Sequence, residues 1–265
     1  MNRKLDNTFA RLKLSGRKGL MPFITAGYPS RRKFDTAVNV ICESGADVLE
    51  IGFPHSDPLA DGPVIQHSSH VAIARGFTVQ KGFAMVRGIV ARHSVPVVVM
   101  CYSNLILRAG IERFVAQCSD AGVSGLIVPD MIVEEGADLR AMCAQHHIAF
   151  INLVTPTTPT ERAREIAATG SGFLYLVTVS GTTGARRALD SSVGTLAKRI
   201  GKVSSLPVCI GFGISSPEMV AKAARYGDGV IIGSKILQLI DADSQDSSFP
   251  TLRSFLKDVR EKLGA

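Results

Sequence analysis

The sequence predicts a single-domain (β/α)8 barrel, the TIM-barrel fold, over residues 1–265. Short runs of β-branched and aliphatic residues alternate with segments of helical period along the chain, a pattern typical of parallel α/β folds. Eight such runs occur, and most have a helical segment behind them, which favours a closed barrel over an open doubly wound sheet. The hydrophobic content of 46% suits one large core. We see no linker, low-complexity tract or repeat beyond the βα unit itself.

The elements are expected in the following order. A short amphipathic helix through Leu5, Phe9 and Leu12 comes first and packs under the barrel, although the basic N-terminus would also fit a cleaved organelle transit segment. The eight strands are expected to begin near Leu20, Asp47, Pro96, Gly125, Ile148, Gly172, Leu206 and Gly229. Apolar residues of helical spacing follow the first and third strands, namely Phe34, Ala37, Val38 and Ile41, and Ile111, Phe114, Val115 and Cys118.

Two intervals between predicted strands are longer than the others, one from Asp47 to Pro96 and one from Gly172 to Leu206. Active sites of such barrels are built from the loops that follow the strands. We therefore expect extended functional loops after the second and sixth strands. The segment from Ser180 to Ala188 contains two glycines and few large apolar residues, so we expect it to be a mobile lid.

Composition argues against several classes of function. The net charge of +7 would suit nucleic-acid binding, but the basic residues are dispersed and no stacking or groove-reading motif accompanies them. No apolar run approaches the ~18 residues of a membrane span, and no signal peptide is visible. The five cysteines form no CxxC pair and no metal-ligand spacing. We therefore expect a cytoplasmic protein with reduced thiols and without a metal site.

Two carboxylates mark the candidate catalytic region. Glu50 lies within an apolar strand, where Val48, Glu50 and Gly52 share one face. A carboxylate inside a parallel sheet is costly unless it is paired, protonated or functional. A loop rich in proline and glycine follows and carries Asp61. A core salt bridge would explain Glu50 alone, but this loop favours a functional interpretation.

Glycines after the last two strands predict a phosphate site. The seventh strand leads into Gly211, Phe212 and Gly213, and the eighth into Gly233 and Ser234. Loops at these positions, with free N–H groups at a helix N-terminus, form the usual phosphate site of barrel enzymes. Ser215 and Glu218 also have the spacing of a capping box, with Pro217 suited to the first turn. Tyr175, on the sixth strand, is either a core residue or a group whose hydroxyl faces the barrel mouth.

Several segments together resemble the tryptophan synthase α subunit family. They are residues 22–27 (PFITAG), the Glu50 strand, 56–63 (SDPLADGP), 183–186 (TGAR) and 211–215 (GFGIS). The resemblance runs in order from about residue 5 to residue 240, and the segment at 56–63 is its most specific part. It implies a (β/α)8 lyase that cleaves indole-3-glycerol phosphate to indole and glyceraldehyde 3-phosphate.

The resemblance also implies roles for individual residues. Glu50 matches the general acid/base, and Asp61 matches the carboxylate that accepts the indole N–H. Asp57 matches a contact to the β subunit, and Thr183 and Gly184 match the lid. The phosphate cradle would consist of Gly184, Gly211, Gly213, Gly233 and Ser234. The indole pocket would be lined by Phe23, Met100, Ile127, Tyr175 and Phe212.

The implied partner is the tryptophan synthase β subunit, in an α2β2 heterotetramer. Pyridoxal phosphate is expected on that partner alone, so this chain is expected to bind no cofactor. The chain departs from the family at His55, where Phe or Tyr is usual, and in the sequence Asp130-Met131-Ile132, where a proline two residues after the Asp is usual. A largely regulatory subunit, a stand-alone lyase and another phosphate-binding barrel, such as a sugar-phosphate isomerase, are the alternatives.

Overall fold

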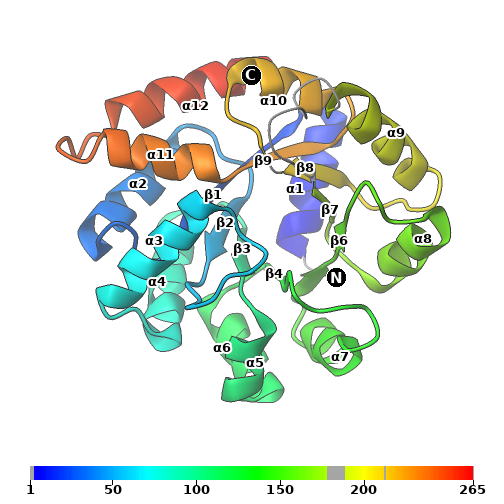
Figure 1. The fold of residues 1–265 in the computed structure, drawn as a ribbon, viewed down its shortest axis with the longest axis horizontal. Helices are drawn as coiled ribbons and strands as arrows, with labels where there is room; N and C mark the ends of the chain where they lie inside the picture. Colours follow the sequence, from blue (N-terminus) through cyan, green and yellow to red (C-terminus); the bar gives the residue numbers. More distant parts are fainter. Residues whose placement is uncertain (1–2, 178–188, 212, 265) are drawn as a thin grey trace.

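The computed structural model describes residues 3–177, 189–211 and 213–264, and their helices surround a central barrel of parallel strands (Figure 1). The strands are β1 (Gly19–Thr25), β2 (Leu49–Gly52), β3 (Val97–Met100), β4 (Gly125–Ile127), β5 (Ala149–Ile151), β6 (Leu153–Val154), β7 (Leu174–Val177), β8 (Val208–Gly211) and β9 (Gly229–Ile232). The helices are α1 (Arg3–Leu14), α2 (Arg31–Glu43), α3 (Pro63–Ala74), α4 (Val79–Arg92), α5 (Ser103–Ala109), α6 (Ile111–Ala121), α7 (Ala137–Gln145), α8 (Thr160–Thr169), α9 (Leu189–Gly201), α10 (Pro217–Ala224), α11 (Ser234–Ala242) and α12 (Pro250–Lys262). The predicted barrel is confirmed.

The described residues form nine strands where the sequence predicts eight, because the fifth predicted strand is divided at Asn152. β5 and β6 lie at the two ends of the sheet, whose order is β5-β4-β3-β2-β1-β9-β8-β7-β6. The carbonyl oxygen of Asn152 accepts a hydrogen bond from the Tyr175 N–H at 2.9 Å. Its side-chain amide donates to the carbonyl oxygen of Ile166 on α8 at 2.7 Å. One residue therefore bonds to β7 and anchors α8, while the sheet runs nearly around the barrel.

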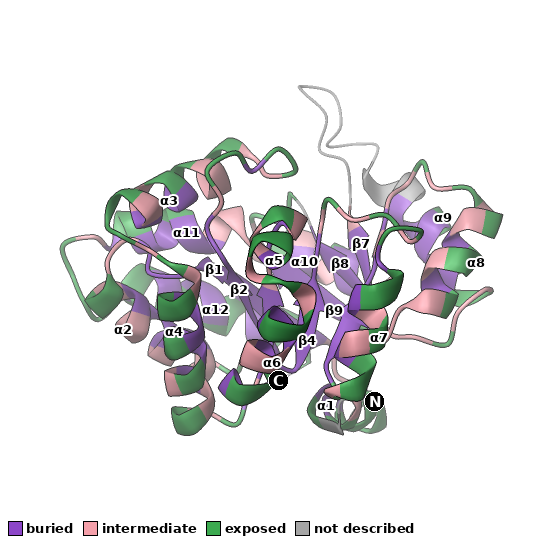
Figure 2. Cartoon of the chain, turned by 90° about the horizontal axis from the view of Figure 1, so that it is seen from below, coloured by how far each residue is buried: buried purple, intermediate pink, exposed green. Residues whose placement is uncertain are grey.

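The strands separate two apolar cores, as the alternation of side chains requires. Leu49 and Ile51 of β2 point outward into the layer between strands and helices. Val48 belongs to the interior of the barrel, on the side to which Glu50 also points. Figure 2 shows the strands as a buried centre, whereas the outer sides of the helices are exposed. The two faces predicted for the Glu50 strand are confirmed.

Helix α1 closes the amino-terminal end of the barrel. Leu5, Phe9 and Leu12 are between 0% and 6% exposed and pack into the interior core. The Phe9 ring lies 5.7 Å from the Phe173 ring, between centroids. The predicted helix under the barrel is confirmed.

The two long intervals differ in content. After β2, a loop at residues 53–62 leads into α3 and then α4, so most of the extra length is helical. After β7, residues 178–188 lie outside the described residues, and they include the whole of the predicted lid from 180 to 188. No helix in the described ranges is long and apolar enough to cross a membrane.

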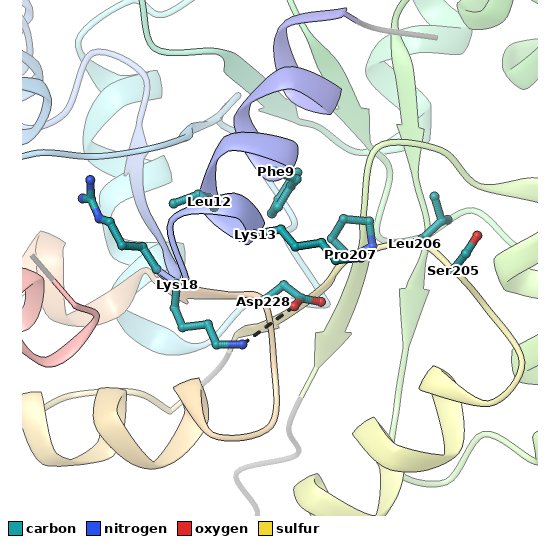
Figure 3. Close-up of a pocket in the computed structure, with 10 residues that line it drawn as sticks. Phe9, Leu12, Lys13, Lys18, Ser205, Leu206, Pro207 and Asp228 are labelled. Atoms are coloured by element: carbon teal, nitrogen blue, oxygen red, sulfur yellow. Dashed lines mark ion pairs between the residues drawn. The ribbon is translucent and has the colours of Figure 1, made fainter.

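A cavity of about 230 Å³ lies at the amino-terminal end of the barrel (Figure 3). It lies among residues that directly precede β1, β8 and β9, and α1 forms one wall. Phe9, Leu12 and Pro207 give it an apolar side, and the Nζ of Lys18 lies 3.8 Å from a carboxylate oxygen of Asp228. This end of a barrel usually carries stabilising residues, and the active site is expected at the other end.

Candidate active site

A cavity of about 240 Å³ lies at the carboxyl-terminal end of the barrel. Phe23, Glu50 and Met100 reach it from β1, β2 and β3, which are neighbours in the sheet. Asp61 enters from the loop after β2, and Tyr175 from β7. The other lining residues are Gly62, Pro63, Ile65, Gly213, Ile214, Ser215, Ile231, Gly233, Ser234, Lys235 and Gln238. The structure thus brings together residues that lie far apart in the sequence.

Glu50 is a buried carboxyl group with an unsatisfied oxygen. Its side chain is 1% exposed, and within the described part of the chain its Oε2 atom has no hydrogen-bond partner. Burial and, to a smaller extent, the negative charge of Asp61 together raise the pKa of Glu50 to about 8. The carboxyl group is therefore mostly protonated at neutral pH. Its pKa is close enough to neutral pH for the group to donate and accept a proton, which suits a general acid/base.

Asp61 is held by a tyrosine. The Tyr102 hydroxyl donates to a carboxylate oxygen of Asp61 at 3.0 Å and accepts from the Ala60 N–H at 3.0 Å. Burial raises the pKa of Asp61, while the hydrogen bond from Tyr102 and the charge of His55 act in the opposite direction, so that the pKa is about 6. Asp61 is therefore mostly ionised at neutral pH, whereas Glu50 is mostly protonated.

The N-terminal end of α11 also forms part of the cavity wall. Gly233 is the N-cap, and it lines the cavity together with Ser234 and Lys235. The first N–H groups of a helix have no partner within it and attract anions. Gly213 also lines the wall, with a φ of 71° that favours glycine. The predicted capping box is wrong by one residue, since Ser216 caps α10 and accepts from the Met219 N–H at 3.4 Å.

Gly211 packs against a residue of the cavity, and its part in the phosphate cradle stays a prediction. A Cβ atom at this position would lie 2.5 Å from the Tyr175 hydroxyl oxygen, a distance that a real side chain does not tolerate. The glycine therefore makes room for the Tyr175 ring, which is 7% exposed. Burial and the nearby carboxylates Glu50 and Asp61 raise the pKa of Tyr175 well above its ordinary value. Tyr175 thus lines the cavity as a neutral hydroxyl.

The remaining predicted residues divide into three groups. Ile127 is 0% exposed in the interior core, and neither it nor Gly211 is among the described residues that line the cavity. Asp57 is exposed in the loop after β2, where a partner is able to reach it. Thr183, Gly184 and Phe212 lie outside the described residues.

Sequence reasoning missed Tyr102, Lys235 and Gln238. Tyr102 follows β3 by two residues, at the edge where the carboxyl ends of parallel strands meet, and that position was a signal that could have found it. Lys235 and Gln238 lie in the first turns of α11, directly after the predicted phosphate loop. In the described ranges, no group of three or more His, Cys, Asp or Glu side chains is placed to hold a metal ion.

The chain is similar over nearly its whole length to known proteins. The family model described as the tryptophan synthase alpha chain matches residues 9–262. The tryptophan synthase alpha chain of Geobacter sulfurreducens is 41% identical, over 98% of this chain and 99% of that protein. The alpha chain of Arabidopsis thaliana is 39% identical, over 98% and 95% of the two chains.

Solved structures agree with the sequence comparisons. The alpha chain of Legionella pneumophila superimposes with a TM-score of 0.89 and 33% identity, over 99% of this chain and 97% of that one. A chain of Mycobacterium tuberculosis tryptophan synthase gives a TM-score of 0.89 and 32% identity, over 98% of each chain. Together with the cavity and its two carboxylates, these matches show that the chain belongs to the tryptophan synthase alpha chain family.

Proposed function

We propose that Glu50 and Asp61 carry out the reaction of this family in the cavity at the carboxyl end of the barrel. The chain is the α subunit that cleaves indole-3-glycerol phosphate to indole and glyceraldehyde 3-phosphate in tryptophan biosynthesis. The observation that supports the roles most directly is Glu50, a buried carboxyl group with a free oxygen beside a second carboxylate.

The chemistry requires one group that first donates and then accepts a proton. Protonated Glu50 delivers its proton to C3 of the indole ring, and positive charge develops on the ring nitrogen. The resulting Glu50 carboxylate then takes the proton of the hydroxyl group on the carbon bonded to C3. That carbon becomes the aldehyde, the carbon–carbon bond breaks, and its electron pair restores the indole ring. Glu50 ends the cycle protonated, as it began.

Asp61 and the two walls of the cavity supply the remaining requirements. Ionised Asp61 balances the charge on the indole nitrogen, an electrostatic contribution made mostly in the transition state. Phe23, Met100 and Tyr175 provide apolar surface for the ring. The N-terminus of α11, with Gly213, holds the phosphate and provides binding energy away from the reacting atoms.

The test is to incubate the purified chain with indole-3-glycerol phosphate and to measure both products. We expect Glu50→Gln and Asp61→Asn each to lose activity by at least ~10²-fold. Glu50→Gln should still bind the substrate in a calorimetric titration, because its shape and most hydrogen-bonding capacity remain. Wild-type turnover in Glu50→Gln would overturn its role, and wild-type turnover in Asp61→Asn would make that residue structural.

The family name implies a β subunit as partner, and we propose an α2β2 assembly in which the rim of the cavity faces that partner. Large apolar side chains are exposed there, with Leu59 at 83%, Leu107 at 60% and Ile132 at 54%. They follow β2, β3 and β4, whose carboxyl ends lie at one edge. The Ser103 hydroxyl and the Asp130 carboxylate, 2.7 Å apart, tie two of these loops together. Asp57 lies in the first of them.

We also propose that the chain binds no cofactor of its own and that pyridoxal phosphate is on the β subunit. The lyase step described above needs only carboxylates and a phosphate grip, which supports this assignment. A cytoplasmic location is proposed from the cysteines, all five of which are free thiols, with four of them buried.

A further inference from the structure

His55 lies beside Asp61 in the loop after β2, and its ring is turned inward. The ring is half-buried, whereas Ser56 and Asp57 directly after it are exposed. It stacks on the Tyr102 ring with 4.9 Å between centroids and an interplanar angle of 27°. This contact covers one face of the tyrosine.

The same tyrosine connects His55 to the catalytic loop. Tyr102 is 5% exposed, and its hydroxyl is bonded on both sides. It donates to a carboxylate oxygen of Asp61 and accepts from the Ala60 N–H, each at 3.0 Å. The position of the Tyr102 ring therefore determines the position of the Asp61 carboxylate.

The imidazole is itself held from the side of the loop. The Asp57 N–H donates to Nδ1 of His55 at 3.1 Å. The ring is thus fixed between a backbone donor and the face of Tyr102. A ring fixed in this way limits the rotation of the tyrosine beneath it, because stacked aromatic groups give up contact area when one of them turns.

We propose that His55 is a positioning residue for Asp61, and that it acts through the Tyr102 ring. The inference rests on the proposed function, because it concerns the carboxylate that balances the charge on the indole nitrogen. Among the described residues, the titratable groups Glu50 and Tyr175 face Asp61, and Asp130 faces Tyr102. None of these three stabilises the ionised form of Asp61, whereas both His55 and Tyr102 do.

The first test removes the ring and then restores it. We expect His55→Ala to lower kcat by ~10-fold, while KM changes by less than ~2-fold, because the phosphate and ring contacts of the substrate stay in place. His55→Phe keeps a stacking ring and should recover most of kcat. His93→Ala is the matched control, since His93 is also half-buried and hydrogen-bonded, to Asn39, but lies far along the chain at the end of α4.

The second test is a double-mutant cycle with Tyr102→Phe, which removes the hydroxyl and keeps the ring. If His55 acts through the Tyr102 hydroxyl, His55→Ala should have little further effect on kcat in the Tyr102→Phe background. Both single variants should also move the acidic limb of the kcat/KM profile to higher pH, because each weakens a contact that favours ionised Asp61.

Two results would overturn the inference, and both differ from a failure of the proposed function. Additive losses in the cycle, or a His55→Phe variant as impaired as His55→Ala, would show that His55 does not act through the tyrosine. A His55→Ala variant that behaves like His93→Ala would show the same. If instead the wild-type chain does not cleave indole-3-glycerol phosphate, the proposed function itself is wrong.

Discussion

Single residues determine the protonation states on which the proposed chemistry depends. Two carboxyl groups share one cavity, yet their surroundings separate their pKa values, to about 8 for Glu50 and about 6 for Asp61. Glu50 has a free oxygen and no compensating donor in the described part of the chain. Asp61 has the Tyr102 hydroxyl. One acid is therefore available to donate a proton while the other stays charged.

The first prediction is a bell-shaped pH dependence of kcat/KM. Activity should rise as Asp61 ionises near pH 6 and fall as Glu50 loses its proton near pH 8. Tyr102→Phe should move the lower limb to higher pH, because the tyrosine hydrogen bond lowers the pKa of Asp61. Steady-state rates of indole release from pH 5 to pH 9 measure both limbs. An unmoved lower limb in Tyr102→Phe would contradict the assignment of that limb to Asp61.

The second prediction concerns stability. The pKa of Glu50 is raised from 4.5 to about 8 on folding, so the folded chain binds a proton that the unfolded chain releases. The contribution of this carboxyl group is therefore present below about pH 4.5 and is lost as the pH rises to about 8. Gln carries no charge at any pH, so the Tm of Glu50→Gln relative to wild type should increase between pH 5 and pH 8. Glu112→Gln, at an exposed position, is the control in thermal melts. A Tm difference between Glu50→Gln and wild type that does not change with pH would contradict a raised pKa of the buried Glu50 carboxyl group.

The carboxyl groups of the proposed catalytic pair could be selected from the sequence, whereas the residues that surround them could be predicted only in part. A lone carboxylate in an apolar strand and a second one in the next loop identify Glu50 and Asp61, because burial of charge is costly enough to be informative. The signal at Tyr102 is weaker, because its position two residues after a strand would suit a core tyrosine equally well. The close approach of the Tyr175 ring to Gly211 is a contact between strands that no local pattern reveals.

At the scale of secondary-structure elements, the periodicity of apolar residues predicted which helices exist better than it predicted where each helix begins and ends. The predicted helices that contain Phe34 and Ile111 are confirmed as α2 and α6. Their apolar residues are spaced so that they fall on one face of a helix, which makes this pattern easy to recognise. The cap of α10 was misplaced by one residue, since Ser215 and Ser216 offer the same chemistry. The division of the fifth strand at Asn152 depends on a bond to α8, which lies beyond any sequence window.

The third prediction concerns helix α1 as a plug for the barrel. Leu5 is 0% exposed, and Leu14 in the same helix is 90% exposed. Leu5→Ala should lower the free energy of unfolding by about 2 to 5 kcal/mol, whereas Leu14→Ala should change it by less than about 0.5 kcal/mol. Chemical denaturation of the two variants measures both values. Equal effects would show that α1 contributes little to the packed core.

The fourth prediction concerns the N-terminus of α11. A Cβ atom at Gly233 would have only ordinary contacts, the nearest at 3.6 Å, so a small side chain fits there. Gly233→Asp should weaken the binding of inorganic phosphate and substrate by ~10-fold or more, because it adds a negative charge to an anion site. Gly233→Asn is the matched control, with the same shape and no charge. Competition of inorganic phosphate with substrate supplies the measurement, and equal affinities in the two variants would contradict a phosphate site at α11.

At the scale of the whole molecule, the barrel places its chemistry and its exposed apolar rim at the same end. Loops that carry Asp61, Tyr102 and Asp130 are joined by hydrogen bonds from one strand end to the next. A partner that docks on this rim would therefore contact the loops that hold Asp61. Sequence resemblance predicted the partner, whereas this connection became visible only in the structure.

The fifth prediction is that a β subunit raises the lyase activity by ~10- to 100-fold, a coupling of roughly 1 to 3 kcal/mol. The sign follows because a partner that prefers the active arrangement shifts the population towards it. Ile132→Asp should weaken this activation, whereas Leu14→Asp, at the other end of the barrel, should not. Indole release titrated with β subunit tests both. Full activity of the chain alone would favour the stand-alone lyase, and activation without intrinsic activity would favour a regulatory subunit.

Closure of the barrel by α1 has a consequence for the path by which substrate and product enter and leave the cavity. Below the cavity, Met21, Phe173 and Cys209 are 0% exposed, and α1 lies beneath them. Among the described residues, the packed amino-terminal end of the barrel therefore offers no path to the cavity, which opens at the carboxyl-terminal end. A subunit seated over that mouth would set the direction of exit without any gate of its own, so that indole released inside would pass to the neighbour before it reached the solvent.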